Sequence, residues 1–359
     1  MSTIKEVAER AGVSIGTASN VIGGAAPVSK ARTARVLAAI QELDYHPNEV
    51  ARSLKAKQTK MLGMVLPDIT NPFFSDLIRG AENAALERGY LLLTANSDEQ
   101  VEREKRFVAA LRSRRVDGIL LAATASKNET HLKSAIAAGV PIVCLDRVAP
   151  GLAVDVVLAD NVRGTQECVR HIIRLGHKKI AIITGALELQ TAGERLAGYR
   201  AALEESGIRY SEDLVMEGDF REEAGYRLGK QLLLRRERPS AIFACNGVMM
   251  LGLLVALDEL GVRCPEEIAL ATFDDLRFAH SFHPHLTAVA QPGNSIGYQG
   301  TNLLIDRVEG KLTGDPLTIR LAPELKIRES TRGYAAGSSS NGSPSRGSTG
   351  TRSTARARQ

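Results

Sequence analysis

From residue 61 onward, short apolar runs alternate with amphipathic stretches of helical length, and this alternation constrains the fold more than any other feature. The first series predicts strands at 61–67, 91–95, 118–122 and 140–145, with helices near 74–88, 102–114 and 129–138. A strand at 154–158 leads into a second series. Its strands are predicted at 180–184, 214–217, 241–244 and 268–273, and its helices near 161–175, 194–206, 222–235 and 248–260.

Two successive series of this kind predict an α/β domain over 61–333 with two open parallel sheets side by side and a cleft between two lobes. Ligands of such sheets bind beyond the carboxyl ends of the strands, so residues in those loops are the candidates for a site. The body is mildly acidic, with a net charge of −3 over 61–333, whereas the whole chain carries +5.

The first 46 residues predict three short helices. Thr3 and Glu6 have the spacing of a capping box, and Ile4, Val7, Ala8 and Ala11 then repeat with helical period. Gly12 interrupts this pattern, Ser14 is suited to cap a second helix with Ala18, Val21 and Ile22 inward, and Gly23-Gly24 ends it. Ser29 is expected to cap a third helix that buries Val36, Leu37, Ile40 and Leu43 before Pro47.

Two helices joined by a tight turn at Gly12-Val13 match an all-α helix-turn-helix layout, although a three-helix bundle without a DNA role has the same elements. Residues 1–60 carry nine Lys or Arg against five Asp or Glu. A basic head on an acidic body points to a polyanionic partner that the head alone contacts.

Residues 47–60 are expected to form a hinge helix and a linker. Leu54 lies among Arg52, Lys55 and Lys57, as in an apolar wedge that enters a DNA minor groove. A solvated linker in which Leu54 packs on the body explains the same pattern equally well.

The remaining composition sets the class of protein. The four cysteines lie far apart without a C-x-x-C pair, as expected of thiols in a reducing compartment. The N-terminus lacks a signal-peptide core and no apolar run approaches the ~20 residues of a membrane span, so we expect a cytoplasmic protein without a membrane partner. Residues 334–359 are rich in Ser, Gly and Thr with four arginines, which predicts a disordered basic tail.

Read together, these segments resemble the lactose/galactose-repressor family of bacterial transcription regulators over about residues 2–333. The resemblance rests on 3–8 (TIKEVA), 11–14 (AGVS), 51–55 (ARSLK), 68–74 (DITNPFF), 115–118 (RVDG), 176–177 (GH) and 195–199 (RLAGY). It implies a homodimeric repressor whose paired heads bind a palindromic operator on double-stranded DNA, under allosteric control by a small-molecule effector.

The resemblance also implies roles for residues of the head and hinge. Ile15, Gly16 and Asn20 occupy the base-reading positions, where Asn20 can pair with adenine and Ile15 can contact a thymine methyl. Ser14, Thr17 and Ser19 are suited to phosphate contacts, although helix capping or solvation accounts for each hydroxyl equally well. Leu54 matches the residue that wedges into the minor groove, with Lys55 beside it.

The body resembles periplasmic sugar-binding proteins that close two lobes on a ligand. Aromatic faces and groups that donate and accept hydrogen bonds are what a sugar requires. The candidate effector residues are Phe73, Phe74, Asp146, Arg147, Thr191, Arg195, Phe220, Asn246 and Asp274. The alternative for Phe73 or Phe74 is a place in the core, and the alternative for Arg147 is an ion pair. Leu189 stands where purine-binding relatives have arginine and Gly247 where aspartate is usual, which favours a pentose or related polyol over a purine.

Other chemistry has weak support. His280, His283 and His285 have no spacing of a closed zinc site and are expected to form a polar loop, so no metal is predicted. Asp274 and Asp275 are adjacent at a strand end and should point in opposite directions, which argues against shared acid–base work. Because hydrolase, P-loop and zinc-protease motifs are absent, neither catalytic residues nor a cofactor are expected. The competing class is a sugar-binding transport receptor, which the basic head argues against.

Overall fold

The computed structural model describes residues 2–23, 27–46, 58–124, 129–276 and 283–332. Leu54 and Lys55 therefore lie outside the described residues, as do His280 and the predicted tail. None of the helices within these ranges combines the length and the apolar character that crossing a membrane requires.

Three helices form the N-terminal unit: α1 (Ile4–Ala11), α2 (Ile15–Gly23) and α3 (Lys30–Glu42). The capping box is present, since Thr3 Oγ1 accepts the Glu6 N–H and the Glu6 carboxylate accepts the Thr3 N–H. Gly12 ends α1 with a left-handed backbone at φ 61°, the conformation that glycine adopts without strain. The buried core consists of Val7, Ala8, Ala11, Ala18, Val36 and Ala39.

Two details of α3 differ from the prediction. Leu37 is 55% exposed rather than buried, because Val36 and Ala39 define the inward face of the helix and Leu37 follows one residue beyond it. Ser29 occupies the N-cap position of α3, but its side chain makes no capping hydrogen bond. The helix therefore begins where the sequence suggested without the expected stabilisation.

The first lobe of the body is a six-stranded parallel sheet in the order β11-β5-β4-β3-β1-β2. Its strands are β1 (Met61–Leu66), β2 (Leu91–Asn96), β3 (Gly118–Leu121), β4 (Ile142–Leu145), β5 (Asp155–Ala159) and β11 (Thr318–Leu321). Its helices are α5 (Pro72–Glu87), α6 (Val101–Ser113), α7 (Thr130–Ala137) and α12 (Gly293–Val308). Two buried apolar clusters, one of which includes side chains of α5 and α12, pack against it.

The second lobe has a six-stranded sheet in the order β12-β10-β9-β8-β6-β7. Its strands are β6 (Ile180–Thr184), β7 (Val215–Glu217), β8 (Ala241–Ala244), β9 (Ala269–Phe273), β10 (Thr287–Ala290) and β12 (Glu324–Lys326). Helices α8 (Asn161–Arg174), α9 (Gln190–Glu205), α10 (Glu222–Leu233) and α11 (Gly247–Leu260) accompany it, with short 3₁₀ turns at Glu212–Leu214 and Glu329–Thr331. The prediction of a wholly parallel sheet is wrong at one edge, where β12 runs antiparallel to β10.

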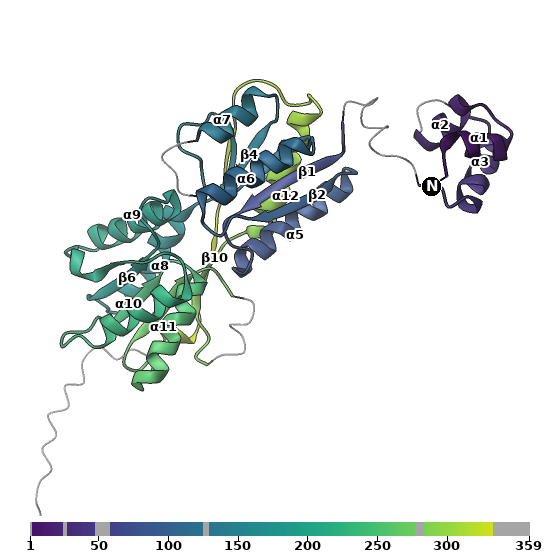
Figure 1. Cartoon of the computed structure of the whole chain (residues 1–359). Helices are drawn as coiled ribbons and strands as arrows, with labels where there is room; N and C mark the ends of the chain where they lie inside the picture. Colours follow the sequence, from purple (N-terminus) through teal and green to yellow (C-terminus); the bar gives the residue numbers. More distant parts are fainter. Residues whose placement is uncertain (1, 24–26, 47–57, 125–128, 277–282, 333–359) are drawn as a thin grey trace, which may run out of the picture.

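The two series are not cleanly successive along the chain. After β10 the chain returns to the first lobe, where α12 packs beside α5 and β11 pairs with β5, and it then crosses back to form β12 (Figure 1). Three segments therefore connect the lobes, after β5, after β10 and after β11. Several connections at one side are the arrangement in which two lobes hinge around a shared cleft.

Helices α5 and α12 approach each other closely through glycine. A Cβ atom on Gly297 would lie 2.0 Å from the backbone oxygen of Leu77, and one on Gly80 would lie 1.9 Å from the backbone oxygen of Asn294. Only residues without a side chain permit this contact, so the two glycines set the distance between the helices.

All four cysteines are unpaired, and Cys144, Cys168 and Cys245 are buried. Burial raises the pKa of the Cys144 and Cys245 thiols to about 12, which keeps them protonated and unreactive. The scattered, mostly buried positions of the four thiols match the prediction.

Candidate DNA-binding and effector sites

Helix α2 presents an apolar side chain to solvent at its first turn. Ile15 is 49% exposed and Gly16 is exposed, whereas Asn20 is partly buried on the same helix. An exposed isoleucine beside a glycine leaves a flat apolar surface that a partner can cover. The three residues predicted to read bases thus lie together on one short helix of the N-terminal unit.

The hydroxyls predicted to contact phosphate have local roles in the protein. Ser14 Oγ accepts the Thr17 N–H at 3.1 Å and lies 2.9 Å from Thr17 Oγ1, so Ser14 caps α2. Ser19 is partly buried. Capping, one alternative considered for these hydroxyls, is therefore present for Ser14. Because the hydrogen bond between the two hydroxyls uses one of their protons, one of them keeps a proton to donate to a phosphate.

A narrow pocket lies between the two lobes. All nine residues predicted from the sequence line it. Six further polar or charged residues that the prediction missed complete the lining: Asp68, Asn71, Glu99, Asp219, Arg221 and Gln291. Several of these lie in loops that follow strands, and the rule that ligands bind at carboxyl strand ends would have singled out Asp68, Glu99 and Asp219.

Four lining residues have left-handed backbones without being glycine: Glu99 at φ 55°, Asp146 at φ 63°, Phe220 at φ 67° and Asp274 at φ 75°. Each lies in a loop near the end of a strand of one of the two sheets. A left-handed backbone is costly for an aromatic residue, and such strain accumulates at functional sites that the surrounding structure holds in place. The side chains of all four residues line the same pocket.

Four polar atoms of the lining are buried and have no hydrogen-bond partner in the part of the chain that the structure describes. They are Asp146 Oδ1, Thr191 Oγ1, Gln291 Oε1 and Arg147 Nε. Buried polar atoms in folded proteins are nearly always paired with protein, water or ligand. Two of these atoms accept hydrogen bonds, one donates, and the threonine hydroxyl does both.

Arg195, Asn246 and Asp274 were expected to supply the polar contacts to a ligand, but protein groups engage them. Arg195 Nε donates to Asn161 Oδ1 at 2.9 Å and its Nη1 to the Cys245 carbonyl. Asn246 caps α11 and donates to the Phe220 carbonyl. Asp274 accepts hydrogen bonds from the Gln291 side chain and the Gly247 N–H. These three side chains therefore shape the pocket wall. The buried lining atoms without a hydrogen-bond partner belong to other residues.

Arg147 makes the ion pair that the sequence left open as an alternative. Its Nη1 donates to both Glu99 oxygens at 2.8 and 3.0 Å, and its Nε lies 3.5 Å from Asp146 Oδ2. Burial raises the pKa of Asp146 to about 6, against the lowering effect of Arg147 and Arg195. Asp146 is thus an ionisable acceptor whose charge changes just below neutral pH.

The aromatic side chains serve the core and the pocket at once. Phe73 and Phe74 are buried in the first lobe in an edge-to-face pair with ring centroids 5.1 Å apart. Phe220 belongs to the core of the second lobe, with the guanidinium groups of Arg147 and Arg195 each less than 6 Å from its ring centroid. Apolar ring surface and unpaired polar atoms therefore face one cavity, as in sites for polar small molecules.

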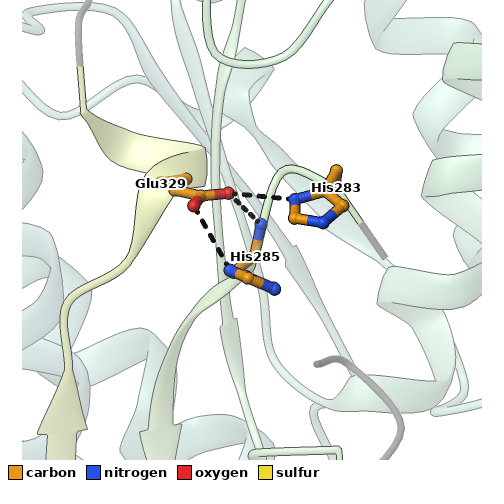
Figure 2. Close-up of side chains that lie close together, drawn as sticks. All are labelled: His283, His285 and Glu329. Atoms are coloured by element: carbon orange, nitrogen blue, oxygen red, sulfur yellow. Dashed lines mark hydrogen bonds and ion pairs between the residues drawn. The ribbon is translucent and has the colours of Figure 1, made fainter. Parts of the chain in front are cut away.

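Away from the pocket, His283 and His285 lie beside Glu329 (Figure 2). The Glu329 carboxylate accepts the backbone N–H of His285 at 3.0 Å and approaches the rings of both histidines. The backbone hydrogen bond from His285 is the largest cause of the lowered pKa of Glu329. These contacts fit the predicted polar loop, in which the carboxylate fastens the loop to the turn at Glu329–Thr331.

Asp275 points away from Asp274, as expected of adjacent residues at a strand end. Both of its oxygens bind Arg328, and Lys326 lies 3.0 Å from one of them. These cations lower the pKa of Asp275 against the effect of its burial. The two carboxylates do not form a shared acid–base pair.

Comparisons with known proteins agree with this arrangement. Residues 3–48 match the model of bacterial regulatory proteins of the lacI family, and residues 169–331 match that of periplasmic binding protein-like domains. The HTH-type transcriptional repressor PurR of Proteus mirabilis is 38% identical over 333 residues, which are 92% of this chain and 97% of that protein.

Solved structures of full-length regulators also superpose on the chain. The transcriptional regulator CelR in complex with cellobiose is 33% identical, with a TM-score of 0.70, over 92% of this chain and 100% of CelR. The lac repressor dimer bound to operator and the anti-inducer ONPF is 28% identical, with a TM-score of 0.81, over 92% of this chain and 99% of that chain. The protein is therefore a DNA-binding transcriptional repressor controlled by a small-molecule effector, not an enzyme, and it belongs to the lacI family of bacterial regulatory proteins.

Proposed function

We propose that the effector is a neutral sugar or a related polyol, bound between the lobes. The observation that carries this proposal is a set of buried atoms at Asp146, Arg147, Thr191 and Gln291 that have no hydrogen-bond partner among the described residues and that together can donate and accept. Each hydroxyl of a sugar also donates and accepts, and the Phe73, Phe74 and Phe220 rings supply apolar surface for its carbon skeleton.

The charge of the lining supports a neutral ligand over an anion. Five carboxylates and three guanidinium groups line the described pocket, and Arg147 and Arg221 are already paired with Glu99 and Asp98. An anionic ligand would meet more like charge than opposite charge. The cellobiose-bound relative, CelR, shows that this fold accommodates a sugar.

A purine has weaker support. Leu189, which precedes α9, is 7% exposed and belongs to the apolar core of the second lobe. It offers no hydrogen bond to a nucleobase, although PurR of Proteus mirabilis is a relative. We therefore place a pentose or related polyol ahead of a nucleobase.

On the DNA side we propose a homodimer that reads a palindromic operator, with Ile15, Gly16 and Asn20 contacting bases and Ser14, Thr17 and Ser19 contacting the backbone. The dimeric, operator-bound lac repressor supports this arrangement. We propose that Leu54 is the minor-groove wedge, with Lys55 beside it. We also propose that 47–60 form the hinge and that 334–359 form a separate tail. A cytoplasmic location follows, because the repressor must reach DNA.

One experiment tests both halves of the proposal. Melting temperatures of the full chain are measured with a panel of sugars, polyols and nucleosides, first alone and then with a duplex carrying palindromes from upstream of its own gene. A sugar or polyol that raises the melting temperature and changes operator affinity supports the effector assignment. A response to nucleosides alone contradicts it, and equal affinity for palindromic and random duplexes across a salt series contradicts operator reading.

A hinge variant tests Leu54. Leu54→Ala is expected to weaken binding to the palindrome while leaving binding to random DNA at low salt unchanged, since a wedge acts only at the specific site. Equal weakening of both would remove the wedge.

A further inference from the structure

A second group of titratable side chains lies in the first lobe and does not line the effector pocket. It contains Glu104 from α6, Glu129 at the N-cap position of α7 and His131 from the first turn of α7. One ligand atom of each residue lies within 4.8 Å of the other two. Glu104 is fully buried, Glu129 is 5% exposed and the His131 side chain is 11% exposed.

Glu104 is held firmly in this group. Its Oε2 accepts the backbone N–H of Thr124 at 2.7 Å, and its Oε1 lies 2.8 Å from His131 Nε2. Thr124 follows β3, and its hydroxyl lies 3.1 Å from that of Ser97, which follows β2. Glu104 therefore fixes one donor group at the carboxyl edge of the first sheet.

Glu129 is held differently. Both of its carboxylate oxygens are buried, and neither has a hydrogen-bond partner among the residues that the structure describes. The same is true of His131 Nδ1. Lys133 lowers the pKa of Glu129 only as a minor influence, and its own side chain is exposed to solvent. An unpaired carboxylate inside a folded protein is uncommon, because burial penalises the charged form.

Two carboxylates in one buried site also repel each other. Burial and the nearby charge of Glu104 together raise the pKa of Glu129 to about 7. Either a proton or a bound cation can relieve this repulsion. A proton links only two of these groups, whereas a cation can be shared by all three residues.

We propose that Glu104, Glu129 and His131 bind a divalent transition-metal ion. Imidazole and carboxylate ligands together suit ions such as Zn²⁺ and Mn²⁺, whereas Mg²⁺ and Ca²⁺ prefer oxygen alone. Ligand atoms around a tetrahedral zinc lie about 3.3 Å apart, so small side-chain rotations within the 4.8 Å limit close the site. The Thr124 N–H would orient Glu104 from behind, as outer hydrogen bonds do for metal ligands.

The cluster of His283, His285 and Glu329 contains similar donors and serves as the natural control. It is exposed, and its carboxylate already accepts a backbone hydrogen bond from His285. No local sequence pattern marks the buried site, because Glu104 lies 25 positions before Glu129 and the fold alone brings them together. This proposal is independent of the effector assignment.

The test uses the full chain after treatment with a chelator. Zn²⁺, Mn²⁺ and Mg²⁺ are titrated by calorimetry into the wild type, Glu129→Gln, His131→Ala and the double variant His283→Ala/His285→Ala. Co²⁺ is added separately for its visible absorption, which reports nitrogen and oxygen ligation. We expect one Zn²⁺ or Mn²⁺ per chain in the wild type and in the double variant. Affinity should be at least tenfold weaker in Glu129→Gln and His131→Ala, and Mg²⁺ should bind weakly throughout.

The melting temperature of the Glu129→Gln variant is a second readout. Without metal its melting temperature should exceed that of the wild type, because an unpaired buried carboxylate is replaced by a neutral amide. Metal should then raise the melting temperature of the wild type and not that of the variant. Absence of metal binding to the wild type would overturn the proposal. A proton shared by Glu104 and Glu129 would then explain how the repulsion between the two carboxyl groups is relieved. Binding that survives Glu129→Gln, or that is lost in the double variant, would overturn it equally.

Discussion

The guanidinium group of Arg195 lies 3.9 Å from the centroid of the Phe273 ring, at the carboxyl edge of the second sheet. At this distance a buried cation is attracted by the face of the ring. The same group donates to Asn161 Oδ1 and to the Cys245 carbonyl. Arg195 thereby joins α8, α9 and the end of β8 on one side of the effector pocket.

Replacing Arg195 should therefore affect stability as well as effector response. Arg195→Ala removes two hydrogen bonds from a charged donor and leaves Asn161 and the Cys245 carbonyl without them, so the free energy of unfolding should fall by roughly 2–4 kcal/mol. Denaturant unfolding at fixed protein concentration measures this change. Arg170→Ala is the matched control, since Arg170 pairs with Glu205 at an exposed surface and its loss should be within error. Equal effects of the two substitutions would contradict the structural role of Arg195.

Arg195 also shows which features of the pocket can be predicted from the sequence. The resemblance of the body to periplasmic sugar-binding proteins was sufficient to place nine residues around one pocket. It was not sufficient to show which polar atoms the protein itself engages, because Asn161 and Cys245 lie 34 and 50 positions away along the chain. Hydrogen bonds between distant residues depend on packing rather than on local pattern.

The strands and the helix that the sequence analysis did not predict have a similar explanation. Residues 287–326 contain β10, α12, β11 and β12, none of which the strand and helix pattern resolved. Gln291 was missed as a pocket residue for this reason, since it follows β10. Periodicity indicates that a segment is helical or extended, but the sheet that it joins is set by the three connections between the lobes. On the surface of α3, Leu37 was misplaced because helical period alone does not fix the limits of the buried face.

Asp146 should link effector binding to pH. Its carboxyl group has a pKa of about 6, so the carboxylate form that accepts hydrogen bonds from a sugar is lost as the pH falls from 7.5 to 5. Effector affinity should decrease over this range. Calorimetric titration of the effector against pH measures the effect, and Asp146→Asn should bind more weakly at pH 7.5 with little pH dependence below it. A wild-type affinity that is constant between pH 7.5 and 5 would contradict this role.

Ionised Asp146 should also lower the free energy of unfolding at neutral pH. The pKa of an aspartate raised from 3.8 to about 6 means that the folded state holds the proton more tightly than the unfolded state. This contribution to stability is fully present below pH 3.8 and is lost as the pH rises through about 6. Asp146→Asn should therefore raise the free energy of unfolding at pH 7 by about 1–3 kcal/mol. Denaturant unfolding of both proteins at pH 5 and pH 7 checks the sign, since the difference must be larger at pH 7.

Ile15 should contribute to DNA affinity and not to the stability of the fold. Its side chain is half exposed on α2, so Ile15→Ala should leave the melting temperature unchanged and weaken binding to the palindrome. Asn20→Ala should cost about 1–3 kcal/mol of specific binding and relax the preference at one base pair. Leu37→Ala is the matched control, because Leu37 is an exposed aliphatic residue of α3 in the same unit. Fluorescence anisotropy with palindromic and random duplexes separates the two effects, and equal weakening by Leu37→Ala would remove α2 as the reading helix.

Gly297 provides a test of the packing between α5 and α12. A methyl group at this position would lie 2.0 Å from the Leu77 carbonyl oxygen and 2.9 Å from the Ala81 nitrogen, so one of the two helix backbones must move. Gly297→Ala should therefore lower the free energy of unfolding by about 1–3 kcal/mol, despite the better helix propensity of alanine. Gly193→Ala is the matched control, because Gly193 also lies in a helix and a Cβ there has no neighbour within 4 Å. That substitution should instead stabilise the protein by about 0.5 kcal/mol, since alanine reduces the entropy of the unfolded chain. Denaturant unfolding without effector measures both variants, and only opposite signs agree with a close contact confined to Gly297.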